Sequence, residues 1–243
     1  MGAKTALLVY TDGRPADLLR RPPAPDRDWT RALVAATQPG WTGRGGSAGS
    51  LSDDIYPPDG LIYAGSFPGI DMLCDQQVMV DRPSQLPAHF REPGAGRRMI
   101  LHVMHSVNDW FAYAVWQGGV LLRSLSLAPD SGVVEDIGTP LPFEAPFWAG
   151  EHPVIPVRPA RSSYPLPFHP LDLGEAALRE LVGFVIEGQP MASDIDADAV
   201  ELTGFEVPPA NPVTTAEVEE FIRTHKRTRY TMGPGGSLIP IEE

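Results

Sequence analysis

The chain has 243 residues, and its 31 acidic and 19 basic side chains give it a net charge of −12 at pH 7. The single cysteine, Cys74, excludes an internal disulfide and any structural zinc site that needs two or more cysteines. The acidic balance argues against nucleic acid as a partner, because phosphate binding needs basic residues. No apolar run approaches the roughly 20 residues that span a bilayer. We therefore expect a soluble, cytoplasmic globular protein that binds neither nucleic acid nor membrane.

The first third of the chain predicts short elements separated by turns. Asp28 is expected to cap a helix whose buried face carries Trp29, Leu33 and Thr37. The glycines within residues 42–50 predict a flexible surface loop. Extended segments are predicted over residues 4–11, 61–67 and 71–80, and a short helix over residues 84–91.

The middle of the chain predicts an antiparallel meander over residues 98–137. Gly118-Gly119 has the composition of a two-residue hairpin loop between two strand-like runs. A regular hairpin on that loop pairs Ala114 with Arg123 and places Arg123 on the same face as Trp110 and Leu125. The four predicted strands of the meander are residues 98–106, 110–117, 120–128 and 133–137.

The last part of the chain predicts a crossover followed by helices. Nine prolines within residues 138–170 disfavour regular structure there, whereas the aromatic residues in the same stretch predict an ordered crossover over the meander. Asp172 and Glu175 resemble the capping box of a helix that ends at Gly188. Further predicted elements are a short turn over residues 194–200, a strand over 202–207 and a helix starting near Thr214.

Strands and helices do not alternate strictly, which favours an α+β fold over a doubly wound sheet. We expect a mainly antiparallel sheet with helices packed on it. A single domain is predicted over residues 1–230, with residues 231–243 as a tail.

Three residues are candidates for catalysis. Cys74 is a potential nucleophile, but Asp71 and Asp75 flank it and disfavour the thiolate, so a buried inert thiol is the alternative. Glu144 and His152 lie in an aromatic stretch of the crossover and are potential general acids or bases. A packed and capped loop needs the same two residues for ordinary reasons, and we favour that interpretation.

Other residues are candidates for binding. Arg123 is a charge within an apolar hairpin, so we expect either a structural ion pair or an anchor for a carboxylate or phosphate. Trp148 and Glu151 are ligand-binding candidates in the crossover. His102 and His105 have the spacing of a metal-binding pair on a helix, but their neighbours predict a strand, which places them on opposite faces. No metal or cofactor is therefore expected.

Several stretches together resemble a known family. They are residues 1–5, 56–60, 82–87, 104–110, 124–137, 142–153 and 164–173. Their combination resembles an uncharacterised family of actinobacterial cytoplasmic proteins, known only as a domain of unknown function, over roughly residues 1–207. The resemblance implies one continuous domain and a bacterial source. It implies no activity and no catalytic residues.

Three functions remain open at this point. The leading expectation is a non-catalytic intracellular protein that binds a partner protein or a small ligand, because no nucleotide, metal or triad motif is present. The alternative is a metal-independent hydrolase or transferase that uses His152 or Cys74 together with a carboxylate. A third possibility is a structural subunit of a homo-oligomer. The sequence does not set the oligomeric state.

Overall fold

The computed structural model describes residues 2–43, 45–154, 165–208, 229–232 and 238–241, the last two ranges by their backbone. The chain divides into two compact units, residues 1–210 and 211–243. In the second unit, β10 (Arg229–Met232) pairs antiparallel with β11 (Leu238–Ile241). The expected domain boundary at residue 230 falls within β10, and the helix expected near Thr214 lies outside the described residues.

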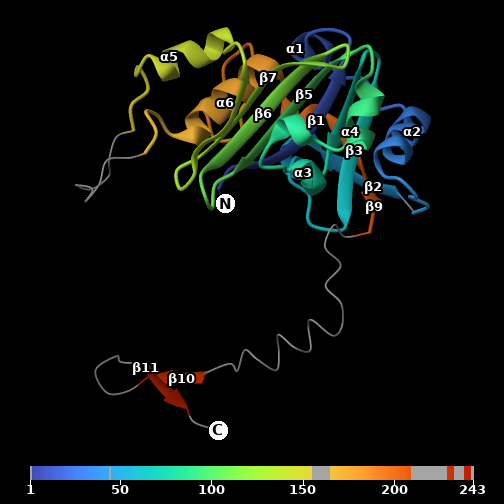
Figure 1. Cartoon of the computed structure of the whole chain (residues 1–243). Helices are drawn as coiled ribbons and strands as arrows, with labels where there is room; N and C mark the ends of the chain where they lie inside the picture. Colours follow the sequence, from blue (N-terminus) through green and yellow to red (C-terminus); the bar gives the residue numbers. More distant parts are fainter. Residues whose placement is uncertain (1, 44, 155–164, 209–228, 233–237, 242–243) are drawn as a thin grey trace. The chain divides into compact units, whose positions relative to one another are not determined.

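One antiparallel sheet organises the first unit (Figure 1). Among the described residues it has nine strands in the order β2-β9-β3-β4-β1-β5-β6-β7-β8, and each neighbouring pair is antiparallel. This confirms the predicted α+β fold. The strands are β1 (Lys4–Thr11), β2 (Gly45–Ser50), β3 (Leu61–Phe67), β4 (Ile70–Cys74), β5 (Arg98–His105), β6 (Trp110–Gln117), β7 (Val120–Ala128), β8 (Gly132–Gly138) and β9 (Glu201–Glu206).

Helices lie on both faces of the sheet. The α-helices are α1 (Pro15–Leu18), α2 (Arg27–Thr37), α3 (Leu51–Asp54), α4 (Ala88–Arg91), α5 (Ala145–Trp148) and α6 (Pro170–Leu181). Short 3₁₀ helices are η1 (Gln76–Val78), η2 (Pro83–Gln85), η3 (Glu92–Gly94), η4 (Pro142–Glu144) and η5 (Ala197–Ala199).

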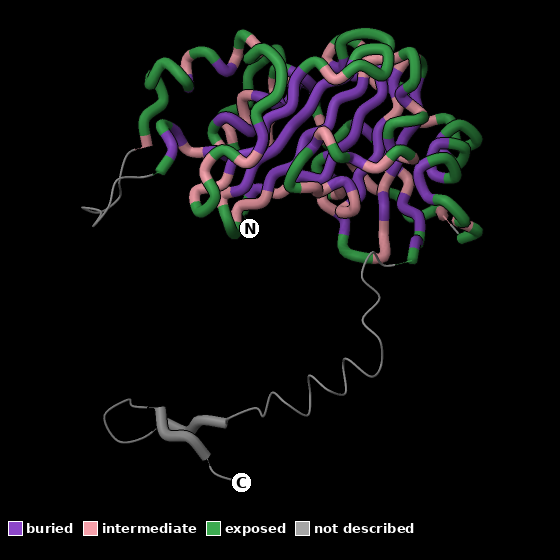
Figure 2. The backbone as a smooth tube through the Cα atoms, viewed as in Figure 1, coloured by how far each residue is buried: buried purple, intermediate pink, exposed green. Residues whose placement is uncertain are grey.

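The sheet separates two hydrophobic cores, and Figure 2 shows its strands as buried segments between exposed loops. Side chains alternate along a strand, so β1 sends Leu7 and Val9 to one core and Leu8 and Tyr10 to the other. The first core includes α5 and α6, and the second includes α2 and α4. We call the two sides of the sheet the α6 face and the α2 face.

A histidine and a glycine fix α6 against the sheet. The helix begins at Pro170 after the cap residue His169, whose side chain accepts a bond from the backbone N–H of Leu171. Gly174 lies so close to the strands that an added Cβ would come within 2.7 Å of the Met104 sulfur. His102 bonds to the Gly174 carbonyl over 2.9 Å. The lack of a side chain at Gly174 therefore permits the close approach of α6.

Local patterns located most strands well, and some neighbouring predictions were wrong. The predicted strands over residues 4–11 and 61–67 coincide with β1 and β3. The loop expected over residues 42–50 contains the edge strand β2 instead. Asp26, and not Asp28, caps α2, and Trp29 is 59% exposed on the outer side of that helix. Of the segment expected to be extended over residues 71–80, β4 ends at Cys74 and η1 follows.

The β6–β7 hairpin contains a bulge that the sequence did not reveal. Gly118 and Gly119 form the turn with positive φ angles of 57° and 83°, as their composition predicted. The register then shifts by one residue next to Trp116, so Arg123 lies opposite Val115 and not opposite Ala114. A one-residue shift moves a side chain to the other side of a sheet. Arg123 therefore lies on the α6 face with Leu125, not on the face of Trp110.

The crossover and α6 also differ from expectation. The prolines of residues 138–170 predict irregular structure throughout, but η4 and α5 form there. The capping box predicted at Asp172 and Glu175 is absent from α6, because the Glu175 carboxylate instead accepts the backbone N–H groups of Ile186 and Glu187. The helix ends at Leu181, before a residue with a positive φ of 112°, Gly183.

Candidate functional site

Arg123 and Glu144 form a buried ion pair on the α6 face. Both side chains are fully buried, and the guanidinium donates from Nε and Nη2 to the two carboxylate oxygens over 2.9 and 2.7 Å. Glu144 also accepts bonds from the Tyr113 hydroxyl, the Trp148 indole and the backbone N–H of Leu141. This is the structural ion pair that was one of the two expectations for Arg123.

The ion pair fixes the crossover to the meander. Burial alone would raise the pKa of Glu144, but the bonds from Arg123 and Tyr113 outweigh it and lower that pKa. Arg123 bonds further to the Asp136 carboxylate and to the carbonyl of Ile137. Glu144 is therefore an ionised, fully bonded anchor for η4, which leaves it poorly suited to exchange a proton with a substrate.

Cys74 is enclosed within the α6 face of the sheet. Its thiol is fully buried, and burial followed by the charges of Asp54 and Asp75 raises its pKa. Asp75 itself accepts bonds from the Gln38 amide over 2.6 Å and from the Gln77 backbone over 2.8 Å. A protonated and inaccessible thiol is the inert cysteine that the flanking carboxylates suggested.

The other crossover candidates lie apart from these groups. The ring of His152 stacks on Phe147 with centroids 4.2 Å apart, and it lines a cavity beside α6 that neither Cys74 nor Glu144 lines. Trp148 is partly exposed and donates to Glu144, and Glu151 is exposed. The structure thus brings Trp148 to Glu144 but does not gather His152 and Cys74 around a shared cavity.

His102 and His105 lie on opposite faces of β5, as the strand pattern predicted. The Gly174 carbonyl can only accept, so Nε2 of His102 carries the proton and Nδ1 accepts from the Thr5 hydroxyl over 2.9 Å. Burial lowers the pKa of His102 to about 4. His105 packs edge-on against Tyr56. Across the described residues, no group of three or more His, Cys, Asp or Glu side chains is placed to hold a metal ion.

A separate set of polar residues lies where three neighbouring strands come together at one end of the sheet. Thr11 is the last residue of β1, Arg98 the first of β5, and Gln117 the last of β6. Antiparallel pairing sets Arg98 directly beside Thr11 on one side and Gln117 on the other. Strand alternation puts all three on the α6 face. The C-terminal turn of α6 borders the same space.

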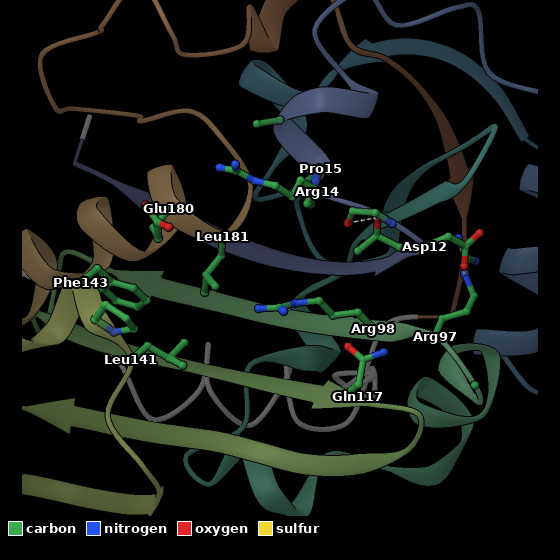
Figure 3. A pocket seen from close by; sticks show the side chains of 15 residues that line it. Asp12, Arg14, Pro15, Arg97, Arg98, Gln117, Leu141, Phe143, Glu180 and Leu181 are labelled. Carbon is green, nitrogen blue, oxygen red and sulfur yellow. Dashed lines mark hydrogen bonds and ion pairs between the residues drawn. The ribbon is translucent and has the colours of Figure 1, made fainter.

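These residues line a cavity of about 580 Å³ (Figure 3). Volumes of roughly 300–1,000 Å³ are typical of small-molecule sites. Loop residues after β1, the end of α6 and the start of η4 complete the wall. They are Asp12, Gly13, Arg14, Pro15, Ala16, Gly96, Arg97, Leu141, Pro142, Phe143, Glu180 and Leu181.

A tight turn after β1 sets the loop that carries Arg14. The Thr11 hydroxyl donates to the Gly13 carbonyl over 2.9 Å, and the Asp12 N–H donates to the Gly69 carbonyl over 2.9 Å. Arg14 then has an extended backbone, and Pro15 is the first residue of α1. The loop is therefore held to the sheet at two points, which fixes where Arg14 begins.

The arginines of this cavity differ in their partners. Arg97 binds the Asp12 carboxylate over 2.8 Å and also binds Asp71, and in Figure 3 it extends toward Asp12. Arg98 is partly buried and extends toward Leu181. Within the described residues, neither Arg14 nor Arg98 forms an ion pair. The side chains of Gln117 and Glu180 form no hydrogen bond with another described residue. These four side chains are available to a ligand.

Sequence reasoning missed this cavity. Arg14 and Arg98 looked like ordinary polar residues at the ends of a strand and a turn. Only a long-range contact would have revealed them: β1 pairs with β5, so the end of β1 lies beside the start of β5. The wall contributed by η4 depends further on the Arg123–Glu144 ion pair.

Comparison with known proteins places the chain in a family. The model of a family of unknown function, DUF6928, matches residues 5–205. The chain belongs to this family. That confirms the resemblance to a domain of unknown function, and the match spans the first unit almost completely. No curated protein and no solved structure matches the chain.

Proposed function

We propose that the protein binds a small molecule in the cavity where β1 and β6 end and β5 begins. One observation carries the proposal: a cavity of about 580 Å³ collects polar side chains without partners among the described residues, together with the apolar groups of Leu141, Phe143 and Leu181. Convergent polar side chains beside apolar groups are typical of a ligand site, and the wall of this cavity is about equally polar and apolar.

The proposed role is binding and not chemistry. Catalysis by a nucleophile and a base needs the two groups within hydrogen-bond reach. Cys74 is buried away from this cavity, Glu144 is bonded to Arg123, and His152 lines a different cavity. These neighbourhoods support a binding protein over the hydrolase or transferase alternative.

The source and cellular location belong to the same proposal. The stretches that resemble an actinobacterial cytoplasmic family support a cytoplasmic protein of such a bacterium. Among the described residues, no helix is long and apolar enough to cross a bilayer. Fractionation of cells that produce the full chain tests the location, and recovery in the membrane pellet would contradict it.

Binding is testable with a mixed library of small polar molecules. The full chain is labelled with ¹⁵N, and amide shifts of Thr11, Gly96, Gln117 and Leu181 report occupation of the cavity. We expect at least one compound class to shift these signals together. A library that moves none of them contradicts the proposed function.

A pair of matched variants links binding to this cavity. Gln117→Trp puts an indole in the cavity and should abolish the shifts. Val107→Trp adds the same side chain at a turn residue that is 78% exposed and does not line the cavity, and it should leave binding unchanged. Equal effects of the two variants would contradict the assignment of the site.

A further inference from the structure

We propose that the ligand of this cavity is an organic anion, with a carboxylate or phosphate group bound at Arg98 and an apolar body against Phe143 and Leu181. This inference rests on the proposed function and goes further by assigning the chemical class of the ligand. Arg98 is the anion-binding residue in this proposal, because it lines the cavity and has no ion pair within the described residues.

The charged side chains around the cavity are unequally paired. Three arginines and two acids line it, namely Arg14, Arg97, Arg98, Asp12 and Glu180. Asp12 and the neighbouring Asp71 both bind Arg97, and neither forms an ion pair with Arg14 or Arg98. What remains is Arg14 and Arg98 against Glu180. With Asp71 included, three carboxylates face three arginines, but two of these carboxylates bind Arg97, and within the described residues Arg14 and Arg98 have no ion pair.

Arg98 is the residue for which a counter-ion matters most. Arg14 is exposed and water can solvate it, whereas Arg98 is only partly exposed. Removing a guanidinium from water is unfavourable unless an anion or hydrogen-bond acceptors replace the water. The chain has a net charge of −12, yet no described carboxylate forms an ion pair with Arg98. An anionic ligand would supply the missing partner.

The surroundings of Arg98 suit an anion that presents two oxygens side by side. A guanidinium presents paired N–H donors that match the two oxygens of a carboxylate or phosphate. Gln117 lies directly opposite Arg98 in the strand pairing, and its side-chain amide adds a neutral donor beside the guanidinium. Figure 3 shows Gln117 next to Arg98 and Arg14 on the opposite wall beneath α1, where it can serve as a second cation.

The rest of the wall sets the other end of the ligand. Leu141 and Phe143 come from the segment that the Arg123–Glu144 pair holds against the meander, and Leu181 comes from the end of α6. In Figure 3 the Arg98 side chain extends toward Leu181, with Phe143 beyond it. A ligand whose anionic group binds Arg98 would therefore place an adjoining carbon skeleton on this apolar wall.

The test uses probes that share one body and differ in their headgroup. Phenylacetate and phenyl phosphate carry the two candidate anions, phenylacetamide is neutral and phenethylamine is cationic. Inorganic phosphate has no apolar body. We expect both phenyl anions to bind at least about tenfold more tightly than phenylacetamide, measured by the amide shifts of Thr11 and Gln117. Their affinity should fall as salt increases, since screening weakens an ion pair.

Arginine variants separate a direct contact from a change in net charge. Arg98→Gln should weaken both phenyl anions by about tenfold or more and change phenylacetamide by less than about twofold. Arg98 has no ion pair with another described residue, so this variant is expected to fold. Arg20→Gln removes the same charge from an exposed arginine that does not line the cavity, and it should leave all affinities unchanged.

Each outcome has a defined meaning. Phenylacetamide or phenethylamine binding as tightly as the anions overturns the inference but leaves the proposed small-molecule function standing. Equal weakening by Arg98→Gln and Arg20→Gln also overturns it. Inorganic phosphate binding as tightly as phenyl phosphate overturns the apolar body. If no probe shifts the cavity signals, the anion inference fails, and the mixed library decides the proposed function separately.

Discussion

Replacing Arg123 with methionine tests the buried ion pair most directly. The substitution removes the two bonds from the guanidinium to Glu144, while Glu144 remains fully buried with the neutral donors Tyr113, Trp148 and the Leu141 backbone. Breaking a buried pair by removing one partner costs about 3–5 kcal/mol, because it leaves an uncompensated charge. We expect Arg123→Met to lose about that much stability at pH 7, measured by urea unfolding.

The reverse truncation should cost less. In Glu144→Gln, Arg123 keeps Asp136, which is half exposed, and the Ile137 and Gly138 carbonyls, so we expect a loss of about 2–3 kcal/mol. The double variant Arg123→Met with Glu144→Gln should lose at least about 1.5 kcal/mol less than the sum of the two, because neither unpaired charge remains.

The pH dependence gives the same comparison an independent measurement. With Arg123 present, the pKa of Glu144 is lowered. The ionised carboxylate therefore stabilises the fold above pH 4.5, the ordinary pKa of a glutamate, and this stabilisation is lost as the pH falls below that value. The deficit of Arg123→Met should therefore be largest at pH 7 and shrink as the pH falls, because burial without the guanidinium raises the pKa of Glu144 in the variant. A deficit under about 1 kcal/mol at pH 7, or a double variant equal to the sum of the singles, would refute this account of the ion pair. If Arg123→Met does not fold, Arg123→Lys keeps the charge, loses the paired geometry and serves as the milder test.

Three further predictions concern the core. The pKa of His102 is lowered to about 4, so the neutral ring contributes roughly 3 kcal/mol of folding stability above pH 6.5, and this stability is lost as the pH falls toward 4. His102→Gln should remove that pH dependence. An NMR titration of the ring near pH 6.5 would contradict the prediction. Burial raises the pKa of Asp75 from 3.8 to about 6, so ionisation of Asp75 lowers the stability of the wild type as the pH rises through that range. The stability of Asp75→Asn relative to the wild type should therefore be greater at pH 7 than at pH 3.5 by roughly 3 kcal/mol. The same relative stability at both pH values would be evidence against this. Gly174→Ala should destabilise the protein by about 1–3 kcal/mol in thermal unfolding, since the added Cβ would come within 2.7 Å of the Met104 sulfur. A gain in stability of about 0.5–1 kcal/mol, as for an unobstructed glycine in a helix, would show that α6 has room for a side chain there.

The sequence predicted what is encoded locally. The apolar runs that became β1 and β3 end at turn residues, so their limits could be read without knowing their partners. The Gly118-Gly119 turn was equally evident, because both residues need positive φ. What the pattern did not contain was the bulge beside Trp116, which shifts Arg123 to the other face. A bulge depends on how two strands fit each other, and neither strand alone specifies it.

The candidate site was harder to predict than the fold. Arg123 was correctly singled out because a charge within an apolar strand needs an explanation. Arg14 and Arg98 needed none, since arginines are common beside turns and at strand ends. Their importance follows only from the pairing of β1 with β5 and from the position of α6 above that pair. Pairing between distant strands is not visible in a single sequence, and this explains why the cavity was not predicted.

The position of β9 has a consequence for biosynthesis. This strand is the last of the sheet in chain order, yet it lies between β2 and β3, which are translated some 150 residues earlier. Until residues 201–206 leave the ribosome, β2 has no neighbour and β3 exposes an unpaired edge. Unpaired edges in nascent chains favour aggregation, and long-range pairing folds slowly. The half of the sheet from β4 through β8 has all its strands earlier, so it can assemble on the ribosome first and wait for β9 to complete the other half.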